Sequence, residues 1–502
     1  MAINRQTCLF FVRFSDFTLR TMTESYDMTH FHTHLQRGLF MVFSAWAAHQ
    51  AWASGYHFGT QSVSTQGTAN SSAAEAADPS TIFYNPAGLT KLEGTQATIN
   101  LNIVAPRIKY EDARAYYPDG TEITTAPNGS RDVERSGKIT DSAAVAPHAY
   151  VSHQVNDQVW LGLGMFVPFA SGTEYEKHSV LRYNLNELSL QSIALQPTVA
   201  YRINPQHAIA AGVVAQNSKA TLRQFANFGA FAGRNGVADG YAEVKGDDWG
   251  VGYNLAWLWD INDSARMGVN YRSKVSHELQ GNAEWQLVGA GFANPVLANR
   301  VRQLGYVAKE DASVKLVTPE SLSVHGMYRV NPKWDVFGDV TWTRHSRFNQ
   351  VNLKYANSKV VANPVTGGVT RSDETIIRPN WRNTYKVALG AAYQYSEPLQ
   401  MRFGVAYDQS PVRNADSRLS TLPDNDRIWL SLGAKYDLSK QHSINAAYSH
   451  VFIKNARANV NGWCGAERAG AGAKACVSSR THGSANYKNR AHIVGLQYTY
   501  KF

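Results

Sequence analysis

The last ten residues of the chain alternate between two kinds of side chain. Because successive residues of a β-strand point to opposite faces, this period of two predicts a strand with one apolar, aromatic face and one small or polar face. A transmembrane barrel strand presents such faces to lipid and to the lumen. An ordinary amphipathic edge strand would alternate in the same way, so the rest of the chain has to decide. The first face is Val494, Leu496, Tyr498, Tyr500 and Phe502; the second is Ile493, Gly495, Gln497, Thr499 and Lys501.

Strands with the same alternation recur from about residue 97 to the end, and they are joined by short and long connections in turn. Six short turns and seven long connections join 14 strands. Tight turns at one end and long loops at the other are the topology of outer-membrane barrels, so 97–502 are predicted to form an all-β transmembrane antiparallel barrel of about 14 strands. The turns centre on 156–157, 204–205, 262–263, 331–332, 397–398 and 439–440, and the long loops on 111–142, 170–184, 225–246, 281–312, 346–380, 409–426 and 453–488.

Composition agrees with a barrel and argues against two other classes of protein. No stretch approaches the roughly 18 consecutive apolar residues of a membrane-spanning helix, and lipid otherwise admits only closed barrels. The formal net charge is +10 and the pI about 9.3, but Lys and Arg are scattered rather than clustered. We therefore expect no nucleic-acid partner.

The N-terminal residues 1–53 are predicted to be a targeting segment. Arg37 precedes a short apolar run, and Ala51-Trp52-Ala53 gives a small-x-small cleavage site before Ser54. Residues 1–27 do not fit a signal peptide, which suggests an upstream misread start with Met28 as the true initiator. Residues 54–96 are rich in Ser, Thr, Ala and Gly and do not alternate. They are either a plug inside the lumen or a loose periplasmic tail.

Two cysteines, Cys464 and Cys476, follow the targeting segment. An even pair in an exported protein predicts a disulfide that closes a surface loop, with two free thiols as the alternative. Their spacing and the absence of a nearby His argue against a metal site, and we expect no cofactor.

The chain resembles the long-chain fatty acid transporters of Gram-negative outer membranes, the FadL-type family. The resemblance covers 54–502 and implies a 14-strand barrel with an N-terminal luminal hatch at 54–96, which acts as a monomer by ligand-gated diffusion. Its partners would be a hydrophobic ligand, membrane lipid, lipopolysaccharide and the barrel assembly machinery, with Phe502 as assembly signal. The matching segments are Asn85-Pro86-Ala87 (the hatch motif), Tyr271-Arg272-Ser273, Trp381-Arg382-Asn383, Tyr407-Asp408-Gln409-Ser410-Pro411-Val412, Arg418, Pro423-Asp424-Asn425-Asp426-Arg427, Trp429-Leu430-Ser431 and Gly433.

Two of the long loops contain unexpected apolar residues, which usually mark binding. They are Phe225, Phe228 and Phe231 in one loop and Leu287, Val288 and Phe292 in the other. The resemblance places the first capture groove for a hydrophobic solute there. The alternative is that these side chains pack on each other as a cap.

A fatty acid also needs a cation for its carboxylate. Lys219 and Arg223 share the polar face of one strand, which we interpret as luminal, and Arg382 lies at the outer end of another. Each could instead be a solvated lumen residue or a lipopolysaccharide contact. Pro168 interrupts the third strand, where the resemblance implies a kink that opens a lateral window; alternatively it only ends the strand.

Nothing in the sequence indicates an enzyme. It has no Gly-x-Ser-x-Gly elbow and no His-Glu-x-x-His pair. The predicted function is passive, ligand-gated uptake of long-chain fatty acids or similar molecules, with aromatic or alkane hydrocarbons as alternative substrates. A general porin or a barrel lipid hydrolase is the alternative of another class.

Overall fold

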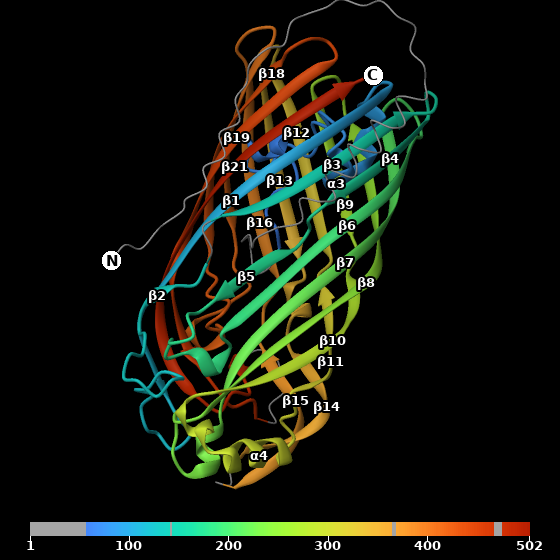
Figure 1. The fold of residues 1–502 in the computed structure, drawn as a ribbon. Coiled ribbons are helices and arrows are strands. Elements are labelled where there is room, and N and C mark those ends of the chain that lie inside the picture. The colour runs from blue at the N-terminus through green and yellow to red at the C-terminus, as the bar shows by residue number, and fades with distance from the viewer. Residues whose placement is uncertain (1–56, 141–142, 364–367, 466–473) are drawn as a thin grey trace, which may run out of the picture. The chain divides into compact units, whose positions relative to one another are not determined.

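The computed structural model describes residues 57–140, 143–363, 368–465 and 474–502. These residues form a closed antiparallel β-barrel whose strands run obliquely around it (Figure 1). The predicted targeting segment 1–53 lies outside the described residues. No helix among the described residues is long and apolar enough to cross a membrane.

Fourteen strands form a ring in which each pairs with the next along the chain and the last pairs with the first, which confirms the predicted strand number. The ring consists of β1 (Thr95–Tyr116), β3 (Ala144–Gln154), β4 (Val159–Phe166), β6 (Glu187–Arg202), β7 (His207–Asn227), β8 (Asp239–Asp260), β9 (Ala265–Arg272), β12 (Ser321–Asn331), β13 (Trp334–Thr343), β16 (Thr384–Gln394), β17 (Leu399–Asp408), β18 (Arg427–Asp437), β19 (His442–Val460) and β21 (His482–Lys501). All six predicted short turns lie between consecutive ring strands at one end, the short-turn end.

At the opposite, long-loop end, further strands extend the wall, and four of the expected long loops contain more strand than predicted. The ends of β7, β8, β19 and β21 reach into 225–246 and 453–488, and parts of four strands that were not predicted lie in 281–312 and 346–380. β10 (Val275–Val288), β11 (Lys309–Thr318), β14 (Val351–Ala362) and β15 (Val369–Arg378) continue the hydrogen-bonded ladder through these ranges. A wall that projects beyond lipid needs no apolar outer face. In these strands polar residues point outward, whereas apolar residues such as Leu279, Leu316 and Leu353 point inward. The other elements are β2 (Gly137–Lys138), β5 (Ala170–Glu174), β20 (Cys476–Val477), η2 (Arg182–Asn184), η3 (Phe228–Ala232), η4 (Ala290–Ala293), α4 (Pro295–Gln303), η5 (His345–Arg347) and η6 (Ala415–Ser417).

The side-chain faces agree with the alternation in the sequence. In β21, Leu496 is 57% exposed and its neighbour Gln497 is 0% exposed; in β18, Leu430 is 48% exposed and Trp429 is 0% exposed. The exposed side chains of these strands form an apolar outer belt, and the buried ones point into the lumen. The predicted lipid and lumen faces of the C-terminal strand are therefore confirmed.

Residues 57–94, which we call the plug segment, are packed inside the barrel rather than extended from it. They contain α2 (Val63–Gln66), α3 (Thr81–Tyr84) and η1 (Pro86–Lys91), and most of their side chains are buried. Small luminal residues make room for them: a Cβ at Gly404 would lie 2.1 Å from the carbonyl carbon of Thr68. The predominance of small residues on the luminal face thus reflects a filled lumen.

Removal of Phe502 should reduce the amount of assembled barrel much more than the stability of barrels that do assemble. Phe502 contributes one backbone hydrogen bond, from its N–H to the carbonyl of Thr95 at 2.9 Å, and its ring is 59% exposed beside Tyr500. Such a residue contributes about 1 kcal/mol at most, so a large defect would reflect recognition during assembly. The measurement is the folded, heat-modifiable fraction in isolated membranes, with Phe502→Tyr as the aromatic control. Normal levels of the truncated chain would contradict this prediction.

Candidate functional site

An aromatic cluster lies at the long-loop end, around Phe228. This side chain is 1% exposed, and its ring contacts those of Tyr306, Trp285, Phe231 and Phe292 at centroid distances of 4.6, 5.9, 6.3 and 6.3 Å. Edge-to-face and offset pairs at such distances are favourable beyond simple burial. These rings come from η3, from the end of β10, from η4 and from the connection between α4 and β11, so the fold joins η3 to a part of the chain more than 50 residues further on.

The structure brings together four of the six predicted groove residues: Phe228, Phe231, Leu287 and Phe292. Phe225 and Val288 instead belong to the interior cluster of the barrel, where Phe225 packs on Tyr241. Sequence reasoning missed Trp285 and Tyr306, although an apolar Trp two residues before Leu287 was an available signal. A hollow with about 1170 Å³ of empty space opens beside Phe225, Phe228, Phe231, Trp285 and Tyr306.

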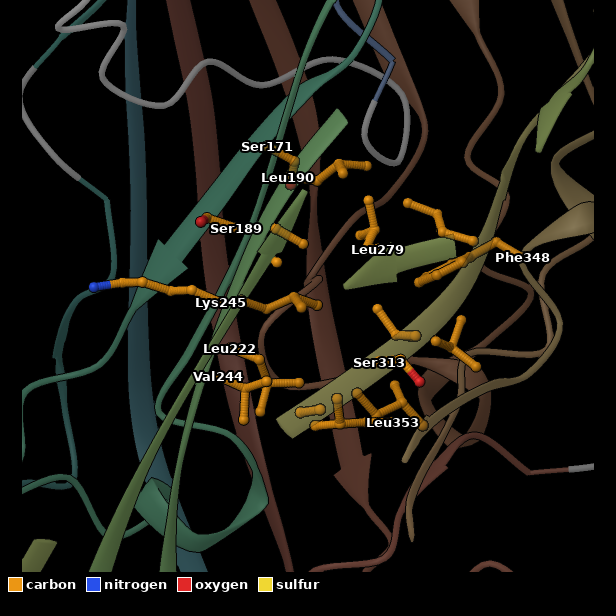
Figure 2. A pocket seen from close by; sticks show the side chains of 18 of the residues that line it. Ser171, Ser189, Leu190, Leu222, Val244, Lys245, Leu279, Ser313, Phe348 and Leu353 are labelled. Atoms are coloured by element: carbon orange, nitrogen blue, oxygen red, sulfur yellow. The ribbon is translucent and has the colours of Figure 1, made fainter. Parts of the chain in front are cut away.

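A second cavity, almost wholly apolar, lies inside the long-loop half of the barrel. Its walls come mainly from β6, β7, β8, β10, β11, β14 and β15. Figure 2 shows the side chains of Leu190, Leu222, Leu279, Phe348 and Leu353 around it, while Lys245 extends away from it. An enclosure of this chemistry suits the tail of a hydrophobic molecule.

The prediction that Lys219 and Arg223 face the lumen is wrong. In β7 the buried, luminal side chains before Arg223 include those of Val214, Gln216, Ser218 and Leu222, so the odd-numbered residues up to Arg223 point outward. Arg223 is also surrounded by Glu174, Glu187 and Glu243, at 3.0, 2.6 and 2.7 Å. A polar face indicates the lumen only within lipid, and this part of β7 projects beyond the outer apolar belt.

Arg382 lies in the connection between β15 and β16 and lines neither of these cavities. Its Nε donates to the carbonyl of Ser410 at 3.1 Å, and its Nη2 is 3.8 Å from Asp426. Its side chain is 31% exposed. Arg382 therefore contacts a neighbouring loop rather than an internal binding space.

A third, polar cavity lies between the plug segment and the lumen wall, and it is lined by two cations that the sequence did not single out for carboxylate binding, Arg272 and Lys386. Arg272 donates to Gln196 Oε1 at 2.8 Å and to the carbonyl of Phe83 at 3.1 Å. The Lys386 ammonium lies 4.9 Å above the ring of Trp429. Within the described part of the chain, no carboxylate lies within 4.0 Å of either cation.

The carboxylates that line this polar cavity have other partners. Asp339 accepts hydrogen bonds from Ser323 and Thr341 at 2.5 and 2.7 Å, and Asp408 lies 3.5 Å from Arg427. Arg272 and Lys386 are thus positioned to pair with an anion that enters the cavity.

The plug segment is attached to the wall by polar contacts. Arg402, which is 2% exposed at its side chain, forms a bidentate pair with Glu75 at 2.7 Å to each oxygen. Gln497 accepts from the backbone N–H groups of Val63 and Ser64 at 3.1 and 3.0 Å. Such contacts orient the segment inside the barrel while leaving polar surface in the lumen.

The Asn85-Pro86-Ala87 motif has a clear structural role. The Asn85 side chain accepts from the N–H of Ala87 at 3.0 Å and so caps η1, whose first residue is Pro86. Its amide nitrogen donates to the carbonyl of Trp257 at 3.0 Å. The motif therefore both starts η1 and joins the plug segment to β8.

Pro168 lies in the break between β4 and β5. β4 pairs with both β3 and β6, whereas β5 pairs with β6, and on its other side the N–H of Glu174 donates to the carbonyl of Ile139 at 3.0 Å. The carbonyl of Pro168 accepts from the N–H of Phe58 at 2.9 Å, and that of Val167 accepts from Gln61 Nε2 at 2.8 Å. The plug segment thus contacts the wall at the point where its ladder is interrupted.

Cys464 and Cys476 are joined in a disulfide with a Cα–Cα distance of 5.5 Å. Cys476 belongs to β20, which pairs with β15. The described residues contain no group of three or more His, Cys, Asp or Glu side chains that could hold a metal ion.

Comparison with known proteins agrees with this architecture. A model of the family described as outer membrane protein transport protein (OMPP1/FadL/TodX) matches residues 44–502. An outer membrane protein of Neisseria meningitidis serogroup B is 52% identical over 486 residues, 93% of this chain and 99% of that protein. The long-chain fatty acid transport protein of Escherichia coli O6:H1 is 27% identical over 429 residues, 80% of this chain and 87% of that protein.

The fold is shared with a solved structure of a Pseudomonas aeruginosa FadL homologue, with a TM-score of 0.76 at 23% identity over 89% of this chain and 100% of that one. The protein is thus an outer-membrane channel for hydrophobic compounds and not an enzyme. Since the family match spans nearly the whole chain after the N-terminal residues, the chain belongs to the FadL/TodX family of outer membrane transport proteins.

Proposed function

We propose that this channel takes up hydrophobic molecules that carry a carboxylate, of which long-chain fatty acids are representative. The observation that carries the proposal is the combination of the apolar cavity with the polar cavity that holds Arg272 and Lys386. An alkyl tail gains free energy on burial, at roughly 25 cal/mol per Å². A carboxylate that leaves water needs a charged partner, which those two side chains offer.

The route we propose begins at the aromatic hollow beside Phe228, where a solute would first leave water. It continues through the apolar cavity to the polar cavity at the plug segment. The solute would leave through the wall beside Pro168, because the ladder is interrupted there and the plug segment contacts it. We propose passive transport: the apolar tail is more stable in the apolar cavity and in the membrane interior than in water, so no energy source is required.

An uncharged hydrocarbon is the second candidate substrate. The cavity that favours it is the apolar one, into which no charged side chain points in Figure 2. An aromatic or alkane molecule could occupy it without using Arg272 or Lys386.

Uptake by reconstituted vesicles distinguishes the two substrates. We expect the protein to accelerate entry of labelled oleate more than entry of labelled toluene, relative to protein-free vesicles. Competition by unlabelled oleate, but not by its methyl ester, would show that the carboxylate is recognised. Acceleration of toluene alone would overturn the proposal and favour the hydrocarbon.

A further inference from the structure

The outer wall carries a dense group of cations on β1, β2 and β21, which lie side by side in the barrel (Figure 1). Three pairs of them stand directly opposite each other in the strand register: Arg107 with Arg490, Lys109 with Lys488, and Lys109 with Lys138. All five side chains are exposed, and all five share the outer face. We call them the basic patch.

Directly opposed like charges destabilise a sheet. Two pairs of carboxylates stand opposite each other in the described strands, Glu174 with Glu187 and Glu243 with Glu284, and each pair has a cation within 3.0 Å, Arg223 or Lys309. Opposed cations occur in the described strands only in the basic patch. Among the paired positions of the described strands, Lys or Arg opposite another charged residue otherwise meets a carboxylate. Examples are Lys309 opposite Glu284, Lys354 opposite Glu374 and Arg223 opposite Glu243. The basic patch is therefore an exception that the rest of the fold does not explain.

Carboxylates of the protein do not neutralise the basic patch. Glu111 lies 2.8 Å from Lys488, and Asp112 accepts from Asn486 nearby. Within the described residues, no ion pair within 4.0 Å involves Arg107, Lys109, Lys138 or Arg490. Four of the five cations are thus left to an external anion.

The position of the basic patch relative to the apolar belt indicates the depth in the membrane at which that anion would lie. On β1, the exposed Ile99, Leu101 and Ile103 lead directly toward Arg107 on the same face. With 3.3–3.4 Å per residue, Arg107 lies roughly 13 Å beyond Ile103 along the strand, and Lys109 roughly 7 Å further. The direction is toward the long-loop end, which faces outside the cell in barrels of this topology. The patch therefore lies where the headgroups of the outer leaflet begin.

An apolar surface for lipid chains adjoins the patch. Phe452 of β19, which is 50% exposed, stands opposite Arg490, and Tyr448 stands opposite Val494 further down the same strands. An amphipathic lipid could thus place its chains on these side chains and its anionic head on the cations.

We propose that the basic patch is a binding site for the phosphate groups of the phosphorylated glycolipid of the outer leaflet, lipid A. One phosphate lies between Arg107 and Arg490, and the second lies in the next row, between Lys109, Lys138 and Lys488. Phosphate oxygens accept several charge-assisted hydrogen bonds at once, and Arg matches them in a bidentate fashion. Bound phosphate offsets the repulsion between the opposed cations, so the lipid and the strand pairing stabilise each other.

The test uses the purified full-length protein in micelles with lipid A that carries both phosphates, with the same lipid after removal of its phosphates, and with inorganic phosphate. Native mass spectrometry and the shift in Tm report binding. We expect retained lipid and a raised Tm only with phosphorylated lipid A. The variant Arg107→Gln/Arg490→Gln should bind it at least about tenfold more weakly, the loss expected for one charged hydrogen bond.

The matched control is Lys309→Gln/Lys315→Gln, which removes the same charge from outward positions where each lysine lies near a glutamate. It should bind lipid A as the wild type does. Equal weakening in both variants would show a dependence on net charge alone and overturn the proposal, as would equal Tm shifts with phosphate-free lipid or with inorganic phosphate. If the arginine variant does not assemble, the wild-type protein still tests the proposal, because it should bind phosphorylated lipid A and not the phosphate-free lipid.

Discussion

Deleting residues 58–92 should turn the barrel into an open, ion-conducting pore. The plug segment occupies the lumen with buried side chains, and small residues such as Gly404 let it pack directly against the wall. Without it, the lumen of a barrel of 14 strands would fill with water. Since wider barrels with 16–18 strands hold aqueous channels, we expect single-channel conductance to rise by on the order of tenfold or more.

The barrel should assemble without the plug segment, because its closure depends on strand pairing between β1 and β21 and not on the plug. The luminal side of Arg402 would then be solvated by the water that replaces Glu75. A graded control is Glu75→Gln, which removes the charge from one partner of a buried pair but keeps its size. We expect an intermediate and fluctuating conductance, since breaking a buried pair typically costs about 3–5 kcal/mol. A deletion variant with wild-type conductance would contradict the assignment of residues 57–94 as a plug.

Changing Arg272 and Lys386 together to Met should weaken fatty acid binding by at least about tenfold, while a hydrocarbon of equal length binds as before. Each charge-assisted hydrogen bond to a carboxylate contributes about 1.5–3 kcal/mol. The apolar cavity is separate from these residues and should keep its affinity for the tail. Calorimetric or tryptophan-fluorescence titration of both ligands gives the measurement.

Two controls separate recognition of the carboxylate from structural damage. Arg272 also donates to the carbonyl of Phe83 in the plug segment, so Lys386→Met alone, which breaks no such contact, should reproduce part of the loss. Lys219→Met/Lys315→Met removes two exposed, outward cations and should leave binding unchanged. Equal losses for fatty acid and hydrocarbon would show that Arg272 and Lys386 act only on the structure.

Much of the barrel could be predicted from the sequence because lipid imposes a strict rule on each strand. Where a strand crosses the membrane, apolar and small or polar residues must alternate, so Leu430 and Trp429, or Leu496 and Gln497, could be assigned to opposite faces in advance. The six short turns carry their own local signals, and with them the number of strands follows.

For the plug segment, composition allowed only part of the prediction. Its residues do not alternate, which excluded them from the wall, but a loose tail fitted the same composition. The choice depends on contacts such as Arg402 with Glu75 and Gln497 with Val63, which join positions more than 300 residues apart in sequence. No local pattern contains that information.

Outside the lipid the rule that made prediction possible no longer applies. The wall beyond the membrane continues as β10, β11, β14 and β15 with a polar outer face, so these strands lack the apolar outward face by which the membrane strands were predicted. For the same reason the polar face of Lys219 and Arg223 was assigned to the lumen, although it points outward.

The sequence by itself determined that this chain closes a barrel of 14 strands and which side chains those strands present to lipid, because alternation is a local property of each strand. Only the tertiary structure decided which cations share a cavity and which cations oppose each other. Arg272 and Lys386 line one polar cavity, and Arg107 faces Arg490, because strand register and closure bring together residues that are distant in the chain.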